Sequence, residues 1–143
     1  MHLFNMVTIF VVVTLIGVEF AVSAFVNPAA WRLDPEPQLK LLSRLALVLG
    51  KVMPVWYPVS ALLFGIQTWL HWHTAGSVTL LTADALWFLA SVGGIFFLVP
   101  LNSRIAAGDA DWPRIHRIWD GRHRIRTATL AIAALLLTYV LVH

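Results

Sequence analysis

Long apolar runs dominate the chain, and short polar segments separate them. Four such runs cover approximately residues 3–26, 54–73, 79–101 and 125–142. A helix crosses a bilayer with about 20 apolar residues, so each run predicts a transmembrane helix. We therefore predict an all-α integral membrane four-helix bundle that forms one domain over residues 1–143.

Composition supports a lipid-facing surface and narrows the function classes. Hydrophobic residues make up 59% of the chain and charged residues only 12%, whereas a soluble domain is about 25% charged. The chain has no cysteine, which excludes disulfides and thiolate chemistry. No nucleic-acid-binding module is present, so we expect membrane lipid and a hydrophobic small molecule as partners. A homo-oligomer and a larger membrane complex both stay open.

The positive charges predict the orientation in the membrane. All ten Lys and Arg residues lie in or directly beside the two segments that follow the first and third runs: Arg32, Lys40, Arg44, Lys51, Arg104, Arg114, Arg117, Arg122, Arg124 and Arg126. The positive-inside rule makes that side cytoplasmic and puts both termini outside, in a bacterial inner membrane. No Lys or Arg precedes the first run, so we expect a retained helix rather than a cleaved signal peptide.

Both basic segments carry helical periodicity. Leucines at 39, 42, 45 and 49 recur at helical spacing after Pro35, which predicts an amphipathic helix at the cytoplasmic surface. A second amphipathic helix is predicted in the other segment, where Trp112, His116, Trp119 and His123 are spaced to share one helix face unless Gly121 interrupts that helix.

Glu19 is the only charged residue before Arg32. A carboxylate within a membrane costs a few kcal/mol, so we expect Glu19 to face the bundle interior. Ser23 and Asn27 follow at intervals of four, which predicts a polar stripe on that face. A hydrogen-bonded glutamate that only fixes helix packing is the structural alternative.

Three other polar residues are expected near the same depth on the cytoplasmic half. Asn27 ends the first run, Asn102 ends the third and His123 begins the fourth. Asparagines often end helices, so capping is an alternative for both amides. An interfacial location is the alternative for His123, and the basic residues around it also fit lipid headgroups.

These residues carry a resemblance to a known family. Glu19 in the first run, "VNPAAW", "LVPLNSRIA" and "WDGRHRIRTA" together resemble a family of small four-helix membrane proteins described as anthrone oxygenase-like. The resemblance implies oxidation of anthrones to anthraquinones, and the matching positions are Asn102, Trp119, His123 and Arg126.

The expected function is that of an oxygenase-like membrane enzyme acting on a flat anthrone- or phenol-like molecule. His123 or Glu19 would remove a proton, and Asn102 or Arg126 would stabilise the developing oxyanion. The residues expected to contact the substrate are Asn27, Trp31, Trp56, Phe97 and Trp119. The alternatives are a non-catalytic accessory subunit, a hydrophobic-ligand binder and, less favoured, a proton-coupled carrier.

No cofactor is required for that chemistry. Glu19, His116 and His123 form a two-histidine, one-carboxylate set that would suit non-haem iron, so a metal stays an alternative. A haem ligated across the bundle is not expected, because His71 and His73 belong to the opposite end from His123.

Overall fold

A computed structural model describes residues 1–143 and contains helices only. Its elements are α1 (His2–Ala21), the π-helix η1 (Val22–Val26), α2 (Asn27–Ala30), α3 (Pro35–Leu70), α4 (Ser77–Phe97), α5 (Val99–Ala106) and α6 (Trp112–Val142). Four helical stretches are long and apolar enough to cross a membrane: His2–Ala30, Pro35–Leu70, Ser77–Ala106 and Trp112–Val142. The chain is therefore compatible with an integral membrane protein, as its hydrophobic pattern predicts.

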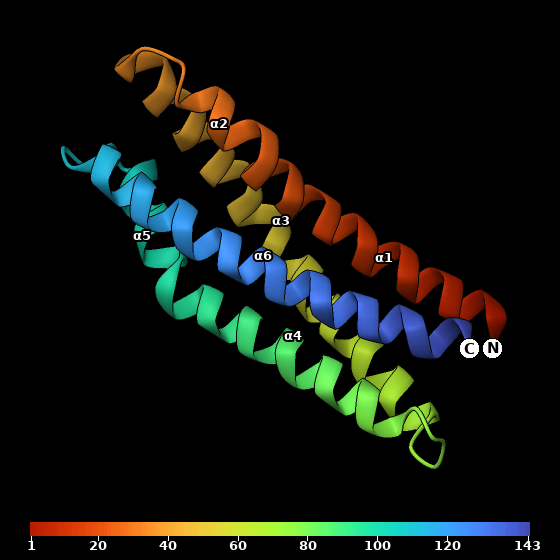
Figure 1. Ribbon diagram of the computed structural model, residues 1–143. Helices are drawn as coiled ribbons and strands as arrows, with labels where there is room; N and C mark the ends of the chain where they lie inside the picture. The colour runs from red at the N-terminus through yellow and green to blue at the C-terminus, as the bar shows by residue number, and fades with distance from the viewer.

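The four long helices lie side by side. α6 packs between α1 and α4, and α3 packs against the same two helices (Figure 1). The chain termini lie together at one end, where the Asn5 side chain donates a hydrogen bond to the carbonyl of Leu141 (3.3 Å). The two basic connections lie at the opposite end, which is the antiparallel arrangement that the charge pattern requires.

The main core is apolar and lies between the long helices. Leu15 of α1, Phe64 of α3, Trp87 of α4 and Leu130 of α6 are almost completely buried there, and the rings of Phe64 and Trp87 stack at 4.8 Å. Large apolar side chains also cover the outer surface of all four helices. Such a surface is unfavourable in water and suits lipid.

The helix boundaries differ from the expected ones at both basic connections. α3 runs without interruption from Pro35 through Pro54 and Pro58 to Leu70, so residues 35–51 are not a separate amphipathic helix. Leu42 and Ala30 instead pack with Ile105 and Ile115 in a second small core. Burial of this apolar face explains why the segment continues as one rod with the following apolar run.

α6 is also continuous, and Gly121 does not interrupt it. Glycine is tolerated in a helix at a cost of about 1 kcal/mol, and packing on both sides of Gly121 holds the helix together.

The third long stretch, Ser77–Ala106, is broken between α4 and α5. Leu98 leaves regular helical geometry with φ −111°, two residues before Pro100. The proline ring has no N–H and would collide with the carbonyl four residues earlier, which explains the break.

Candidate functional site

The π-helix in the first helical stretch aligns two polar side chains. Glu19 and Asn27 are eight residues apart, which in an α-helix overshoots two turns by roughly 80°. In η1 the N–H of Asn27 donates to the carbonyl of Val22, five residues back, and this extra residue returns Asn27 to the face of Glu19. Pro28 explains the widening, because it cannot donate to the carbonyl of Ala24 and its ring pushes that turn open. Both side chains are buried.

Glu19 is held by three side chains from α3 and α6. Tyr57 donates its hydroxyl to Oε1 (2.7 Å), and Arg126 donates Nη2 to Oε2 (2.7 Å). Nδ1 of His123 lies 3.2 Å from Oε2, and Nε2 of the same ring lies 3.3 Å from the backbone oxygen of Glu19. Removing one partner from such a buried network is costly, because it leaves a charge uncompensated.

Both nitrogens of His123 therefore lie near oxygens of Glu19, and Nδ1 also lies 3.3 Å from Nη2 of Arg126, which donates to it when the ring is neutral. A neutral imidazole has one N–H and can satisfy only one of these oxygens, whereas an imidazolium donates to both. A proton that reaches the ring is thus stabilised by Glu19. This arrangement suits a base that gains a proton during a reaction.

Arg126 has room because α4 carries a glycine opposite it. A Cβ atom at Gly94 would lie 2.7 Å from Nη1 of Arg126, closer than side chains tolerate. The guanidinium also lies over the ring of Tyr57, 5.3 Å from the ring centre. Its Nε is buried and has no hydrogen-bond partner in the protein.

A second polar group lies about two helical turns from the first. Asn27 donates Nδ2 to Oδ1 of Asp120 (2.6 Å), and its Oδ1 lies 3.3 Å from Nε2 of His116. The other oxygen of Asp120 pairs with Arg124 at 2.9 Å. Nδ1 of His116 is buried and has no partner.

The four polar residues expected at one depth therefore separate into two levels. Eight residues of helix span about 12 Å, so Asn27 lies on the same face as Glu19 but closer to the end that carries the basic connections. Glu19 and Asn27 thus belong to two neighbouring polar groups, which the first helical stretch (α1, η1 and α2) forms with α6 and, around Glu19, with α3.

Aromatic rings pack around both histidines. Trp31 stacks on His116 with ring centres 4.7 Å apart, and Trp119 stacks on His123 at 4.5 Å. Trp119 also contacts the ring of His116, at 6.2 Å and a tilt of 31°. These contacts fix the orientation of both imidazoles.

A cavity of about 770 Å³ adjoins both polar groups. Its wall is mostly apolar, and its polar or aromatic members are Glu19, Asn27, Lys51, Tyr57, Phe88, Ser91, Asn102, Ser103, His116, Trp119, His123 and Arg126. Several of its wall residues are also exposed on the outer surface, namely Leu47, Gly50 and Pro54 of α3 and Phe88, Ile95 and Val99 of α4 and α5. The cavity is therefore open on its side, between α3 and the broken α4–α5 stretch.

Six of the predicted site residues line this cavity: Glu19, Asn27, Asn102, Trp119, His123 and Arg126. The remaining three predicted contacts lie elsewhere. Trp31 stacks on His116 beneath Arg117 and does not line the cavity, and Phe97 is 60% exposed beneath Arg122.

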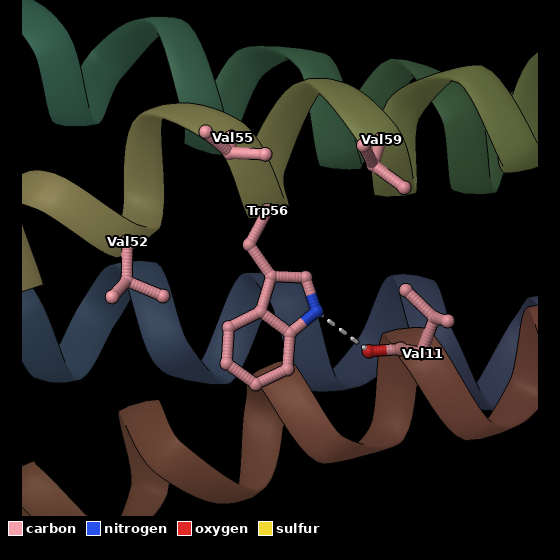
Figure 2. Close-up of a pocket in the computed structure, with 5 residues that line it drawn as sticks. All are labelled: Val11, Val52, Val55, Trp56 and Val59. Atoms are coloured by element: carbon pink, nitrogen blue, oxygen red, sulfur yellow. Dashed lines mark hydrogen bonds between the residues drawn. The ribbon is translucent and has the colours of Figure 1, made fainter.

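Trp56 also lies outside the cavity. Figure 2 shows it in a separate apolar groove between α1 and α3, with Val11, Val52, Val55 and Val59, where its indole N–H donates to the carbonyl of Val11 (3.2 Å). Trp56 follows Val55 on α3 and precedes Tyr57, so it projects from a different side of the helix than Tyr57 does. The structure does not bring Trp56 to a ligand in the cavity.

The metal alternative is not assembled. No three His, Asp or Glu side chains are arranged to hold a metal ion. His116 belongs to the group around Asn27, whereas Glu19 and His123 belong to the other. Glu19, His116 and His123 therefore do not meet as a ligand set.

Sequence reasoning missed Tyr57 and Asp120. Asp120 lies four residues after His116 and three before His123, so its place on their helix face was readable from the sequence. Tyr57 is one of only two tyrosines, but nothing in its apolar surroundings indicates that its hydroxyl reaches Glu19.

No protein-family model, curated protein or solved structure matches this chain. Its function is therefore inferred from the geometry of the site.

Proposed function

We propose that the protein is an oxygenase-like membrane enzyme that binds a flat, lipophilic anthrone- or phenol-like molecule in the cavity and removes a proton from it. The observation that carries this proposal is the Glu19–Tyr57–Arg126–His123 network in the wall of a large, mostly apolar cavity. Clustered ionisable groups that adjoin such a cavity are characteristic of active sites.

The roles follow from the contacts. Nδ1 of His123 accepts the acidic C–H proton of the ligand in exchange for its contact with Arg126, and Glu19 stabilises the imidazolium that results. The unpartnered Nε of Arg126 donates to the ligand oxygen on which negative charge develops. The apolar wall disfavours water, which strengthens both interactions.

The oxidation balances with molecular oxygen as the oxidant. The carbanion adds to O₂ to form a C–O bond, and the proton held by His123 returns to give a hydroperoxide. Loss of the second hydrogen from the same carbon, with cleavage of the O–O bond, releases water and leaves a carbonyl. One anthrone and one O₂ thus give one anthraquinone and one water.

The open side of the cavity suits a ligand dissolved in the bilayer. Its rim between α3 and α4–α5 is lined by apolar residues that are exposed where lipid would lie. We propose a cytoplasmic-side location for this cavity, since it lies at the end of the molecule that carries the basic connections.

A non-catalytic role for the network is the second candidate, and one observation favours it. Both carboxylate oxygens of Glu19 already have partners within the protein. An accessory subunit or a ligand binder could use the same network only to fix the packing of α1, α3 and α6.

Replacement of Glu19 separates the two candidates. The assay is oxygen uptake and anthraquinone absorbance with anthrone as the substrate and the protein in lipid nanodiscs. Glu19→Gln keeps the shape and can still accept from Tyr57, but it turns an NH₂ group towards Arg126, so its folding is checked by circular dichroism. The folded variant should lose at least tenfold in turnover. His73→Phe, at the exposed opposite end, is the matched control and should keep full turnover.

Two outcomes would contradict the enzyme proposal. The first is the absence of anthrone oxidation above the rate in empty nanodiscs. The second is full turnover by Glu19→Gln, which would make the glutamate a packing residue.

A further inference from the structure

Asp84 is an acidic residue of α4 that the proposed chemistry does not use. It follows the start of α4 at Ser77 by about two helical turns, or roughly 10 Å, at the end of the molecule that carries the chain termini (Figure 1). The residue is partly exposed, its Oδ1 atom is buried without a hydrogen-bond partner, and it belongs to none of the ion pairs. A carboxyl group at this depth in a membrane is costly unless it is protonated or paired.

The chain itself offers Asp84 neither a Lys nor an Arg. All ten of these residues lie toward the opposite end of the molecule, and Arg126, which reaches the interior, is bound to Glu19 (Figure 1). A second copy of the chain in the same orientation has the same distribution of charge, so it brings no Lys or Arg to this level. A basic side chain that pairs with Asp84 must therefore come from a different molecule.

Thr68 of α3 lies against Asp84 where α3 and α4 pack together. It is only 4% exposed, and its hydroxyl oxygen has no hydrogen bond of normal geometry. Asp84 and Thr68 thus place two oxygen atoms without partners side by side. Buried polar atoms of this kind are costly when unpaired, so a donor that reaches both oxygens would be stabilised.

The surface beside this pair allows another helix to come close. Ala61, Gly65 and Thr68 follow one another at intervals of four and three residues, so they share one face of α3. Ala61 and Gly65 are exposed, and a Cβ atom added at Gly65 would meet no atom within 4 Å. Small residues one turn apart let two helix backbones pack closely in a membrane. We call Ala61, Gly65, Thr68 and Asp84 the docking strip.

Most of the docking strip lies outside the large cavity. Ala61 belongs to the cavity wall, whereas Gly65, Thr68 and Asp84 do not. The occupant of the strip is therefore separate from a ligand in the cavity. A helix laid along Ala61 and Gly65 covers the whole strip, which favours a helix over a small cation.

We propose that the docking strip binds a transmembrane helix of a different membrane protein, and that this helix carries a Lys or Arg which pairs with Asp84. The basic side chain donates hydrogen bonds to Asp84 and to the hydroxyl oxygen of Thr68. The open side of the cavity near Gly50 stays free, because the strip lies nearer the end that carries the termini. This inference does not rest on the proposed function.

Model transmembrane peptides test the docking strip. Two peptides of about 23 leucines and alanines differ at one position two turns from one end, which holds lysine in the first peptide and norleucine in the second. The full chain carries a donor fluorophore on Ala75→Cys, at an exposed position of the connection before α4, and each peptide carries an acceptor at the matching end. Energy transfer in lipid vesicles gives the dissociation constants. The native protein should bind the lysine peptide about five- to tenfold tighter.

Four variants assign the effect to the docking strip. Asp84→Asn removes the charge and should bind both peptides equally within about twofold, whereas Asp84→Glu keeps the charge and should keep the preference. Gly65→Ile places a branched side chain on the strip and should weaken binding of the lysine peptide about fivefold. Thr82→Val is the matched control, because Thr82 is an exposed polar residue on the opposite side of α4, and it should change neither constant. Circular dichroism checks the folding of each variant.

Several outcomes would overturn the proposal and leave the proposed function untouched. Equal binding of the two peptides by the native protein would show that Asp84 is a neutral acid that recruits no charge. A preference that persists in folded Asp84→Asn would exclude Asp84, and full affinity of Gly65→Ile would exclude helix packing on the strip; if Asp84→Asn does not fold, Gly65→Ile decides. Displacement of the lysine peptide by an equal concentration of dodecylammonium would assign Asp84 to a small lipophilic cation instead.

Discussion

Gly94→Ala tests whether α4 provides the space that the Arg126 guanidinium needs. The new methyl group would lie 2.7 Å from Nη1 and 3.4 Å from Cδ of Arg126. Ordinary contacts begin near 3.4 Å, so the guanidinium must retreat by several tenths of an ångström. We expect this retreat to lengthen its 2.7 Å bond to Glu19 or to move it off the ring of Tyr57.

The expected magnitude combines two opposing terms. Alanine is better than glycine in a helix by about 0.8–1 kcal/mol. A hydrogen bond between charged groups contributes about 1.5–3 kcal/mol, and much of it would be lost. Gly94→Ala should therefore lower the free energy of unfolding by about 1–2 kcal/mol.

Gly93→Ala is the matched control on the same helix. The nearest atom to its new methyl group would be Cδ2 of Phe97 at 3.9 Å, an ordinary contact. This variant should keep or raise the free energy of unfolding, by up to about 1 kcal/mol. The assay is unfolding in mixed detergent and SDS micelles, followed by circular dichroism.

A double-mutant cycle identifies Arg126 as the cause. In an Arg126→Met background, Gly94→Ala should cost clearly less than it does beside the native arginine. Equal effects of Gly94→Ala and Gly93→Ala in the native background would refute the reasoning, because the methyl group would then displace nothing of consequence.

Two further predictions concern topology and access. The chain has no cysteine, so single cysteines can be introduced at the exposed positions Ala75 and Ala107. Ala75→Cys and Ala107→Cys should react with a membrane-impermeant maleimide from opposite sides of the membrane, Ala107→Cys from the cytoplasm. Labelling of both from one side would exclude the four-span topology. Gly50→Phe places a ring at the open side of the cavity, where no atom lies within 4 Å of the new Cβ, and should weaken binding of the unreactive probe 2-hydroxyanthraquinone about tenfold in equilibrium dialysis. Gly65→Phe is the control, on the same helix but outside the cavity, and should bind this molecule as the native protein does. Equal binding by both variants would mean that ligands do not enter between α3 and α4.

The sequence predicts the helical class and the inward direction of Glu19 because both follow from the cost of polar groups in lipid. The same argument places Asn102 inside, where it lines the cavity, whereas it left His123 free to face the headgroups, and His123 is buried. The π-turn before Pro28, which brings Asn27 back to the face of Glu19, could not be predicted from the sequence. Such a turn depends on a balance between the proline ring and neighbouring packing that a hydrophobic pattern does not record.

The aromatic contacts show a similar limit. Trp119 could be assigned to the site because it shares a helix face with His116 and His123, whereas Trp56 could not be separated from Tyr57 by composition. Adjacent residues on a helix point about 100° apart, so one neighbour reaches Glu19 and the other reaches Val11. Which of them faces the cavity depends on the rotation of α3, and that is set by contacts far along the chain.

The uninterrupted course of α6 limits how the chain can tolerate insertions and deletions. His116 and His123 are separated by seven residues, almost two full turns, so both imidazoles face the same way. Losing or gaining a single residue between them would turn one polar group about 100° away from the other. Point substitutions there can be absorbed one at a time, but a change of length cannot. Related chains should therefore vary in length in the connections before Pro35 and Trp112, and keep the interval from His116 to His123 constant.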